Sequence, residues 1–365
     1  MPRELIATAP GKAELREYED GPVGEHDVRI RVEFASPKHG TEGYNFKEDR
    51  LQKKTKFNGD YRLFLPLEEP VPVFPRKLGN MAVGVVTEVG SAVTRFKEGD
   101  RVYGHMSVRE THVRDARAVE GEPPLGSGVR ESYLHPLPEG VRPEDIVLVD
   151  PAHFALAAVR DANIRVGEWV AVFGLGAIGL MIVQLAKRSG AERIFAIDPL
   201  ENRRKLAATL GAERTLDPTA CDVGYEVKKA TGKKGVDVAI DASGSYHALQ
   251  AAMRTVHYGG LLVTCSFYHG DRSPLRLDEE FFIARLTVRA SMPVWGNPSR
   301  DYPMWDDERV EDTVYRLLVN GDLATDGFMD PIVPFEEAAE AYMAASRNPR
   351  QCVKLGIRFG EGSDQ

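Results

Sequence analysis

The stretch Val170–Ala186, VAVFGLGAIGLMIVQLA, decides the fold. An apolar strand runs into the turn Gly174-Leu175-Gly176-Ala177-Ile178-Gly179, and an amphipathic helix follows directly. In such a turn the first glycine permits the tight bend, the second lets the backbone approach a pyrophosphate, and the third allows close helix packing. The helix N-terminus offers unpaired N–H groups and a partial positive charge to the phosphates. The stretch therefore predicts a dinucleotide site at Gly174, Gly176, Ala177, Ile178 and Gly179.

The next apolar segment, RIFAIDP, indicates which dinucleotide is bound. Asp198 ends it at about the 20-residue spacing that the fingerprint requires. A carboxylate there accepts hydrogen bonds from the adenosine ribose and repels a 2′-phosphate, so NAD is predicted over NADP. Arg203, followed by Arg204, could instead bind the 2′-phosphate of NADP. An exposed helix-face charge, or a side chain stacked on adenine, is the preferred interpretation of Arg203.

The pattern of apolar and polar residues on either side of this stretch predicts an α/β protein of two domains. Residues 151–292 alternate continuous apolar strands with helices, which is typical of a doubly wound parallel sheet of the Rossmann type. Residues 1–150 read as short strands and turns, and 293–365 are expected to return to them. A chain of 365 residues exceeds the usual size of a single core. The polar segment Tyr44–Lys77 is interpreted as a solvated loop, with a substrate lid as the alternative.

The net charge indicates the kind of binding partner, and the cysteine content indicates the redox compartment. The net charge of -8 argues against nucleic acid and anionic membranes, so a small molecule is the expected partner. Cys221, Cys265 and Cys352 are widely separated and form no Cys-x-x-Cys pair, which fits a reducing cytoplasm. The sequence begins without a leader pattern and contains no membrane-spanning apolar run.

Four motifs, among them the glycine turn, carry a resemblance to a known family: VGVVTEVG with FKEGDRVYG, GLGAIG, DASG, and VPFEEAAEAY. Together they resemble the medium-chain dehydrogenases/reductases of the alcohol dehydrogenase superfamily, over nearly the whole length. The resemblance implies a GroES-like, mostly-β catalytic domain beside the Rossmann domain, and hydride transfer between a carbinol carbon and nicotinamide. The segments SFYHGD, DEEFFIARLTVRAS and MWDDERV are similar to the bacteriochlorophyllide dehydrogenase-like subgroup, in which many zinc sites are altered.

The loops after the later Rossmann strands complete the expected cofactor site. Ser243 lies in DASG, and Phe267 and Tyr268 lie in SFYHGD. Tyr268 and His269 are expected at the nicotinamide ring, or as lining of the cleft.

The metal-ligand positions of that family are altered in this chain. The family pattern has Cys-Gly-Thr-Asp where this chain has His39-Gly40-Thr41-Glu42, and Gly-His-Glu where Gly79, Asn80 and Met81 stand. By resemblance, Thr41 bonds the substrate oxygen, Tyr44 relays a proton, and Asp150 stands at the third ligand position of polyol-type members.

These replacements predict an enzyme without zinc. A catalytic zinc needs about three protein ligands, and Asn80 and Met81 are poor or soft ones. His153 could complete a weak His-Asp-His site, but a hydrogen-bonded structural histidine is preferred. No cysteine lies between Val89 and Asp150, so no structural zinc is predicted either.

Without zinc, His39 is the predicted acid–base group, because imidazole exchanges protons near neutral pH. Lys38, Tyr44 and Asp150 are alternatives or partners, and Asp150 could orient His39 by a hydrogen bond.

The sequence therefore predicts an NAD-dependent, zinc-independent dehydrogenase that oxidises a secondary alcohol of a sugar, cyclitol or polyol derivative to the ketone. Two alternatives stay open: an NADPH-dependent quinone or enone reductase of the same superfamily, and a non-catalytic nucleotide-binding protein. A homodimer is expected, with LTVRASMPVWG as the pairing edge.

Overall fold

The computed structural model describes residues 1–38, 40, 42–43, 46, 52–117, 133–293, 304–348 and 352–360. The chain divides into two compact units, residues 1–147 with 328–365 and residues 148–327. The sequence placed the domain boundaries at 150 and 293, and the assignment of a catalytic and a cofactor domain to these parts stays a prediction. Each unit is described by itself.

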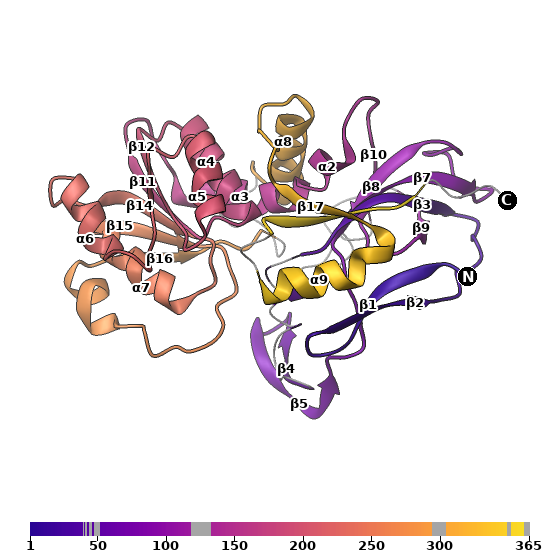
Figure 1. The fold of residues 1–365 in the computed structure, drawn as a ribbon, viewed down its shortest axis with the longest axis horizontal. Helices are drawn as coiled ribbons and strands as arrows, with labels where there is room; N and C mark the ends of the chain where they lie inside the picture. The colour runs from indigo at the N-terminus through magenta and orange to yellow at the C-terminus, as the bar shows by residue number, and fades with distance from the viewer. Residues whose placement is uncertain are drawn as a thin grey trace. The chain divides into compact units, whose positions relative to one another are not determined.

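The second unit is built on a six-stranded parallel sheet with the order β13-β12-β11-β14-β15-β16 (Figure 1). Its strands are β11 (Trp169–Phe173), β12 (Arg193–Ile197), β13 (Arg214–Leu216), β14 (Val236–Asp241), β15 (Val256–Thr264) and β16 (Thr287–Ala290). The central strand β11 is apolar throughout, because a parallel sheet is covered on both faces, and Val170 and Phe173 are at most 1% exposed. The strand order reverses between β11 and β14, which is where open α/β sheets bind ligands. The predicted Rossmann fold is confirmed.

Helices cover this sheet. They are α3 (Val149–Ala162), α4 (Ala177–Arg188), α5 (Glu201–Thr209), α6 (Val223–Ala230), α7 (Tyr246–Thr255) and α8 (Asp307–Val319), with a short π-helical segment at Leu277–Phe281. Helix α3 packs against α4 and α8, and α6 packs against α7. None of the helices in the described ranges is long and apolar enough to cross a membrane.

The first unit is mostly β, as predicted. One sheet has the order β2-β1-β6, formed by β2 (Lys12–Glu17), β1 (Arg3–Ala9) and β6 (Arg76–Lys77). The larger sheet contains β10 (Leu134–Pro136), β8 (Arg101–His105), β7 (Met81–Val89), β3 (Asp27–Ser36), β18 (Lys354–Arg358) and β17 (Met329–Pro334), with β9 (Thr111–Asp115) paired to β3. In β3 the side chains of Val28, Ile30 and Val32 are buried and alternate with less buried residues, as in a strand with one face on the core.

The predicted loop Tyr44–Lys77 contains a β-hairpin where the structure describes it. Strands β4 (Gln52–Asn58) and β5 (Leu63–Pro72) pair with each other as a separate sheet, with Phe57 opposite Phe64. The segment is exposed, as predicted: Tyr61 is 73% and Phe64 66% exposed. The pairing was not predicted, because the charged and proline residues of this segment hide its strand pattern.

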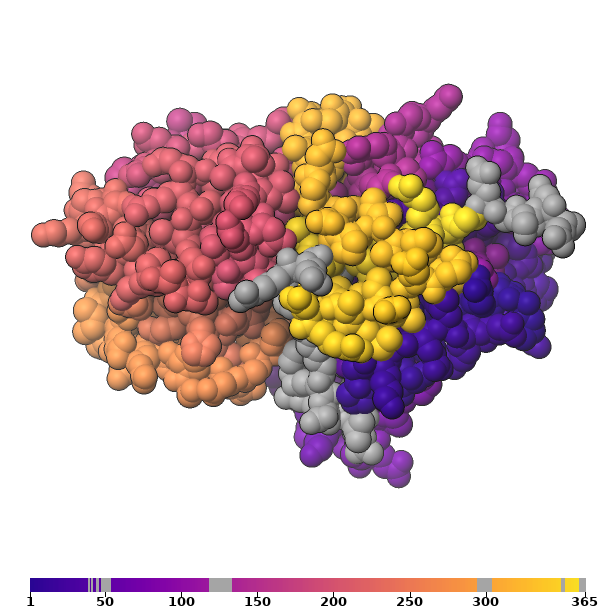
Figure 2. Space-filling model, in the orientation of Figure 1, coloured from indigo at the N-terminus to yellow at the C-terminus, as the bar shows by residue number. Residues whose placement is uncertain are grey.

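The C-terminal part of the chain completes the first unit. Short helix α2 (Pro143–Ile146) lies in the same unit, and a 3-10 turn (Phe335–Glu337) leads into α9 (Ala338–Arg347). Helix α9 packs against β2, and in the space-filling view the yellow C-terminal segment lies directly beside the indigo N-terminal strands (Figure 2). Phe335 and Tyr342 thereby join the core formed by the β-strands.

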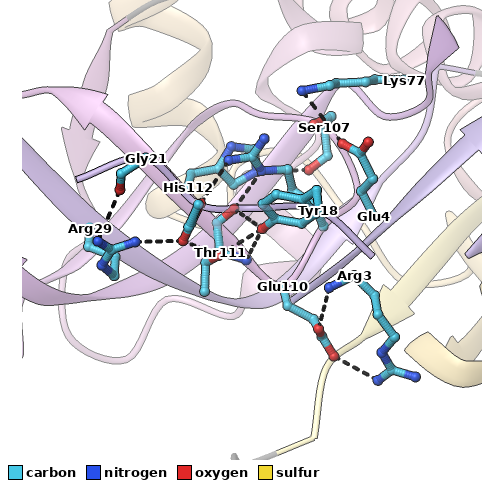
Figure 3. A network of polar contacts seen from close by, with 12 residues as sticks. Arg3, Glu4, Tyr18, Gly21, Arg29, Lys77, Ser107, Glu110, Thr111 and His112 are labelled. Carbon is cyan, nitrogen blue, oxygen red and sulfur yellow. Dashed lines mark hydrogen bonds and ion pairs between the residues drawn. The ribbon is translucent and has the colours of Figure 1, made fainter. Parts of the chain in front are cut away.

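A polar network ties the N-terminal strands to β9 (Figure 3). Tyr18 donates to the Thr111 carbonyl at 2.8 Å, and the Thr111 hydroxyl donates to Asp20. Within this network His112 is buried, and its Nε2 donates to the Ser107 carbonyl at 3.0 Å. Burial, with the positive charges of Arg109, Arg114 and Lys77, lowers the pKa of His112 to about 3. The folded protein therefore holds this histidine neutral.

We expect His112 to make the fold sensitive to acid. The unfolded chain binds a proton at this histidine below about pH 6.5, whereas the folded chain binds it only near pH 3. The free energy of unfolding therefore decreases as the pH is lowered from about 6.5 to about 3, by up to about 1.4 kcal/mol per pH unit. His112→Gln, whose amide can still donate to Ser107, should make that slope shallower in urea titrations between pH 4 and 6.5. His26→Gln, at an exposed site, is the control, and an unchanged slope in His112→Gln would contradict this expectation.

Candidate active site

The glycine loop after β11 has the geometry that the sequence predicted. Gly174 has φ +81°, and a Cβ there would lie 2.7 Å from the Ser243 Cα. A Cβ on Gly179 would lie 1.8 Å from the Gly174 carbonyl oxygen. The first glycine therefore makes the turn and lets the Ser243 loop approach, and the third lets α4 pack onto the turn.

The start of α4 fits a diphosphate. Gly176 is the N-cap and gives no side-chain cap, so the N–H groups of the first turn, including Ala177 and Ile178, are available to an anion. A Cβ on Gly176 would meet only Arg203 Nη1, at 3.9 Å. The lack of other close atoms suits the near approach of backbone to a pyrophosphate that the second glycine allows.

Asp198 lies where the fingerprint requires it and also braces the loop. Its side chain is 4% exposed, Oδ2 accepts from Leu175 N and Oδ1 from Leu200 N, both at 2.8 Å. Arg204 donates to the Asp198 carbonyl at 2.6 Å. A carboxylate oxygen has two lone pairs, so Asp198 can bind the loop and still accept from a ribose hydroxyl.

Arg203 is not the exposed helix-face charge that was one of its two preferred interpretations, and its stacking on adenine stays a prediction. Its side chain is only 18% exposed, and Nη1 lies 3.9 Å from Asp198 Oδ2. The guanidinium therefore lies beside both Gly176 and Asp198 and is a neighbour of the cofactor loop. The helical periodicity of the sequence could not show this, because the contact depends on how α5 follows β12.

Ser243, Tyr268 and Phe267 follow strands β14 and β15 at their carboxyl ends. The Tyr268 hydroxyl donates to Asp241 Oδ2 at 2.5 Å, and Ser243 N donates to Asp241 Oδ1 at 2.9 Å. Burial raises the pKa of Asp241, and burial with the Asp241 charge raises the pKa of Tyr268. Phe267 is 57% exposed. The Tyr268 hydroxyl is thus committed to Asp241 and holds the loop in place.

The role of Asp241 in holding Ser243 and Tyr268 was not predicted. Asp241 is the first residue of the quoted DASG motif and is fully buried. The available signal was an acidic residue ending an apolar strand, the same signal that identified Asp198.

In the first unit, the two altered metal-ligand segments lie side by side. Glu42 Oε2 accepts from Gly79 N at 2.8 Å, and Asn80 N donates to the Ser36 carbonyl at 3.2 Å. Ser36 and Glu42 flank the segment that carries His39 and Thr41. His39, Thr41 and Tyr44 themselves lie outside the described residues, and their catalytic roles stay predictions. The role of Glu42 as the link between the segments was not predicted.

Asp150 and His153 lie in the first turns of α3. Asp150 is 7% exposed, and its predicted contact with His39 involves a residue that the structure does not describe. His153 Nε2 lies 2.6 Å from Asp307 Oδ1 at the start of α8. Burial lowers the pKa of His153, but the hydrogen bond and charges of Asp307, Glu311 and Asp150 outweigh it, so the pKa lies above its ordinary value. This hydrogen bond agrees with the preferred interpretation of His153 as a hydrogen-bonded structural residue, which stays a prediction.

The donors at the second ligand position do not suit zinc. Asn80 offers a carboxamide, and Met81, on β7, is 2% exposed within the core. In the part of the chain that the structure describes, which does not include His39, no three His, Cys, Asp or Glu side chains gather as a metal site. Zinc prefers thiolate, imidazole and carboxylate ligands, so the carboxamide of Asn80 and the thioether of Met81 do not fit a zinc site.

Comparison with known proteins gives the family. Residues 24–136 match the alcohol dehydrogenase GroES-like domain and residues 177–305 the zinc-binding dehydrogenase family. The chain is 39% identical to D-guloside 3-dehydrogenase of Escherichia coli K12 over 362 residues, which cover 98% of this chain and all of that one. It is 32% identical to sorbitol dehydrogenase 1 of Saccharomyces cerevisiae over 211 residues, 52% of this chain and 59% of that one.

Among solved structures, 2R,3R-butanediol dehydrogenase of Bacillus subtilis shares the fold. Its TM-score is 0.71 at 22% identity, with 98% of this chain and 99% of that chain covered. The chain therefore belongs to the medium-chain, zinc-type alcohol dehydrogenase family, whose named members are dehydrogenases.

Proposed function

We propose that this protein is an NAD-dependent dehydrogenase that oxidises a secondary ring hydroxyl of a glycoside or related polyol to the ketone without zinc. The similarity to D-guloside 3-dehydrogenase, 39% identity over 98% of the chain, carries the substrate class. The similarity to sorbitol dehydrogenase 1 supports a polyhydroxylated substrate more generally.

The second unit supplies the cofactor site. When bound, the nicotinamide would supply the acceptor for the hydride lost by the carbinol carbon. The N–H groups at the start of α4 hold the diphosphate, and Asp198 accepts from the adenosine ribose. Asp198 supports NAD over NADP, because its charge repels a 2′-phosphate. Arg203, 3.9 Å away, compensates part of that charge. The enzyme should therefore prefer NAD but still accept NADP with a lower kcat/KM.

The proposed acid–base groups His39, Thr41 and Tyr44 belong to the first unit, whereas Asp150 belongs to the second. His39 accepts the hydroxyl proton as the carbon–oxygen double bond forms, and Thr41 holds the substrate oxygen. Tyr44 passes the proton onward, and Asp150 orients His39. No step requires a metal, and Asn80 with Met81 supports this assignment because the pair is a poor substitute for histidine and glutamate ligands.

The test is a panel of glycosides, cyclitols, polyols and simple secondary alcohols, with NAD and NADP in parallel. We expect turnover of glycosides with a higher kcat/KM for NAD, and a ketone at a ring carbon in the NMR spectrum of the product. Reduction of quinones with NADPH and no alcohol oxidation would overturn the proposal, as would cofactor binding without turnover of any alcohol.

A homodimer is part of the proposal. Strand β16 ends the six-stranded sheet, all of its residues are exposed, and Val288 is 43% exposed. An exposed edge strand offers unpaired backbone groups to a second copy. Light scattering should give a dimer mass for the wild type and a monomer mass for Val288→Lys, whereas a monomeric wild type would contradict this.

The cysteines support a cytoplasmic location. Cys221, Cys265 and Cys352 are all free thiols, as is usual in a reducing compartment. Recovery of the protein outside the cytoplasmic fraction of its cells would contradict this assignment.

A further inference from the structure

The turn Leu78–Asn80 is held rigidly on two sides. Val108 N donates to the Leu78 carbonyl at 2.8 Å, and Met106 N donates to the Asn80 carbonyl at 3.1 Å. Gly79 has φ +121°, and a Cβ there would lie 2.3 Å from Val108 N. Both the conformation and the close approach require glycine, so the backbone that carries Asn80 has little freedom to move.

Buried charged groups hold the neighbouring segment against this turn. Glu42, which is 6% exposed, bonds Gly79 N, and Lys354, which is 5% exposed, donates to the Pro37 carbonyl at 2.9 Å. The hydroxyl of Tyr342 faces Glu42, and burial raises the pKa of that carboxyl. Residues 37 and 42 are thus both anchored, one on each side of the segment with His39 and Thr41.

The Asn80 side chain has a donor that the protein does not use. Nδ2 is buried and makes no hydrogen bond within the described part of the chain. Leaving such a group unsatisfied costs about 1–3 kcal/mol, and buried polar groups in folded proteins are nearly always paired. A donor that is fixed in place, buried and unpaired is suited to a ligand oxygen.

We propose that the Asn80 carboxamide donates a hydrogen bond from Nδ2 to the reacting oxygen of the sugar, at the position where zinc-dependent relatives carry a metal ligand. This inference rests on the proposed function and adds a catalytic residue to it.

The donor would act on the charge that develops at the substrate oxygen. During oxidation the O–H bond breaks, its proton goes to His39, and the oxygen carries partial negative charge until the carbon–oxygen double bond is complete. Asn80 strengthens its hydrogen bond to this oxygen and keeps its own proton, so the balance of protons and electrons is unchanged. A fixed donor in a buried site stabilises such charge more than water does.

The test compares Asn80→Ala and Asn80→Asp with the wild type. Loss of one such donor costs about 10²- to 10³-fold in kcat. We expect Asn80→Ala to show this loss at every pH. Asn80→Asp has the same shape but accepts when ionised. Its kcat relative to the wild type at the same pH should therefore be low at high pH and rise as the pH falls and the carboxyl gains a proton to donate.

Two further readouts separate this role from a structural one. The melting temperature of Asn80→Ala should not fall, because this variant removes an unpaired buried donor. Its NAD affinity should stay at the wild-type value, while calorimetric titration should show weaker sugar binding. Asn320→Asp, at an exposed position after α8, is the control and should match the wild type.

The outcomes are distinguishable. Wild-type kcat in Asn80→Ala, or a loss of kcat accompanied by a loss of stability, would overturn this inference and leave the proposed function standing. A wild-type enzyme that turns over no sugar would overturn the proposed function, and the role of Asn80 with it.

Discussion

Gly179→Ala should destabilise the second unit and abolish cofactor binding. The added Cβ would lie 1.8 Å from the Gly174 carbonyl oxygen, which is backbone and cannot rotate away, so α4 must shift from the turn. Overpacking of this kind costs about 1–3 kcal/mol or more, and each kcal/mol lowers the melting temperature by about 2–4 °C in a domain of this size. Differential scanning fluorimetry with and without NAD measures both effects.

Gly176→Ala is the matched variant. Its Cβ would meet only Arg203 Nη1, at 3.9 Å, so the fold should keep its melting temperature. The methyl group would nevertheless keep the diphosphate from the backbone, and the loss of one or two hydrogen bonds to a charged group should weaken NAD binding by about 10- to 100-fold. Unchanged NAD affinity in Gly176→Ala would mean that the diphosphate binds elsewhere.

His39→Ala should lower kcat for glycoside oxidation by about 10²- to 10⁴-fold, the range for losing a general base. NAD affinity and the melting temperature should stay unchanged, because the cofactor residues lie in the second unit. The limb of the pH–kcat profile that reports deprotonation of the base should disappear as well. Stopped-flow or steady-state measurement of NAD reduction across pH gives both results.

The exposed His26 provides the control for this variant. His26→Ala should retain wild-type kcat at every pH. Equal activity of the two variants would remove His39 from the mechanism and leave Tyr44, Lys38 or Asp150 as the base.

The conformation of the glycine turn after β11 could be predicted from sequence because its determinants are local. Strand β11, the three glycines and the start of α4 are contiguous, and the steric need for each glycine follows from the turn itself. Asp198 adds a single non-local residue at a spacing fixed by one helix and one strand. The fold class followed from the same alternation of strands and helices.

Other contacts at the site could not be predicted, since they join residues far apart in the chain. Glu42 bonds Gly79 across 37 positions, and Tyr268 bonds Asp241 across 27. No periodicity in the sequence links such pairs, and a single acidic residue in a motif could equally be a solvent-exposed side chain. The position of Arg203 beside Asp198 could not be predicted for the same reason, because a helical pattern identifies a face of the helix but not the residues that the face contacts.

The β4–β5 hairpin was missed for a different reason. Ten residues of β5 are nearly all exposed, so the segment lacks the apolar alternation that marks a half-buried strand. Its strands are formed by pairing with each other, and the cross-strand contact of Phe57 with Phe64 at 5.3 Å is visible only after they pair.

The most direct test of the metal-free mechanism is glycoside oxidation by enzyme that has been dialysed against a strong zinc chelator, with the metal content of the same sample measured. We predict that turnover with NAD survives in metal-free protein, since Asn80 and Met81 stand at the second ligand position and His39 is the proposed base. Turnover that is lost on chelation and restored by added zinc would show that the remaining donors hold a metal, and would contradict the metal-free mechanism.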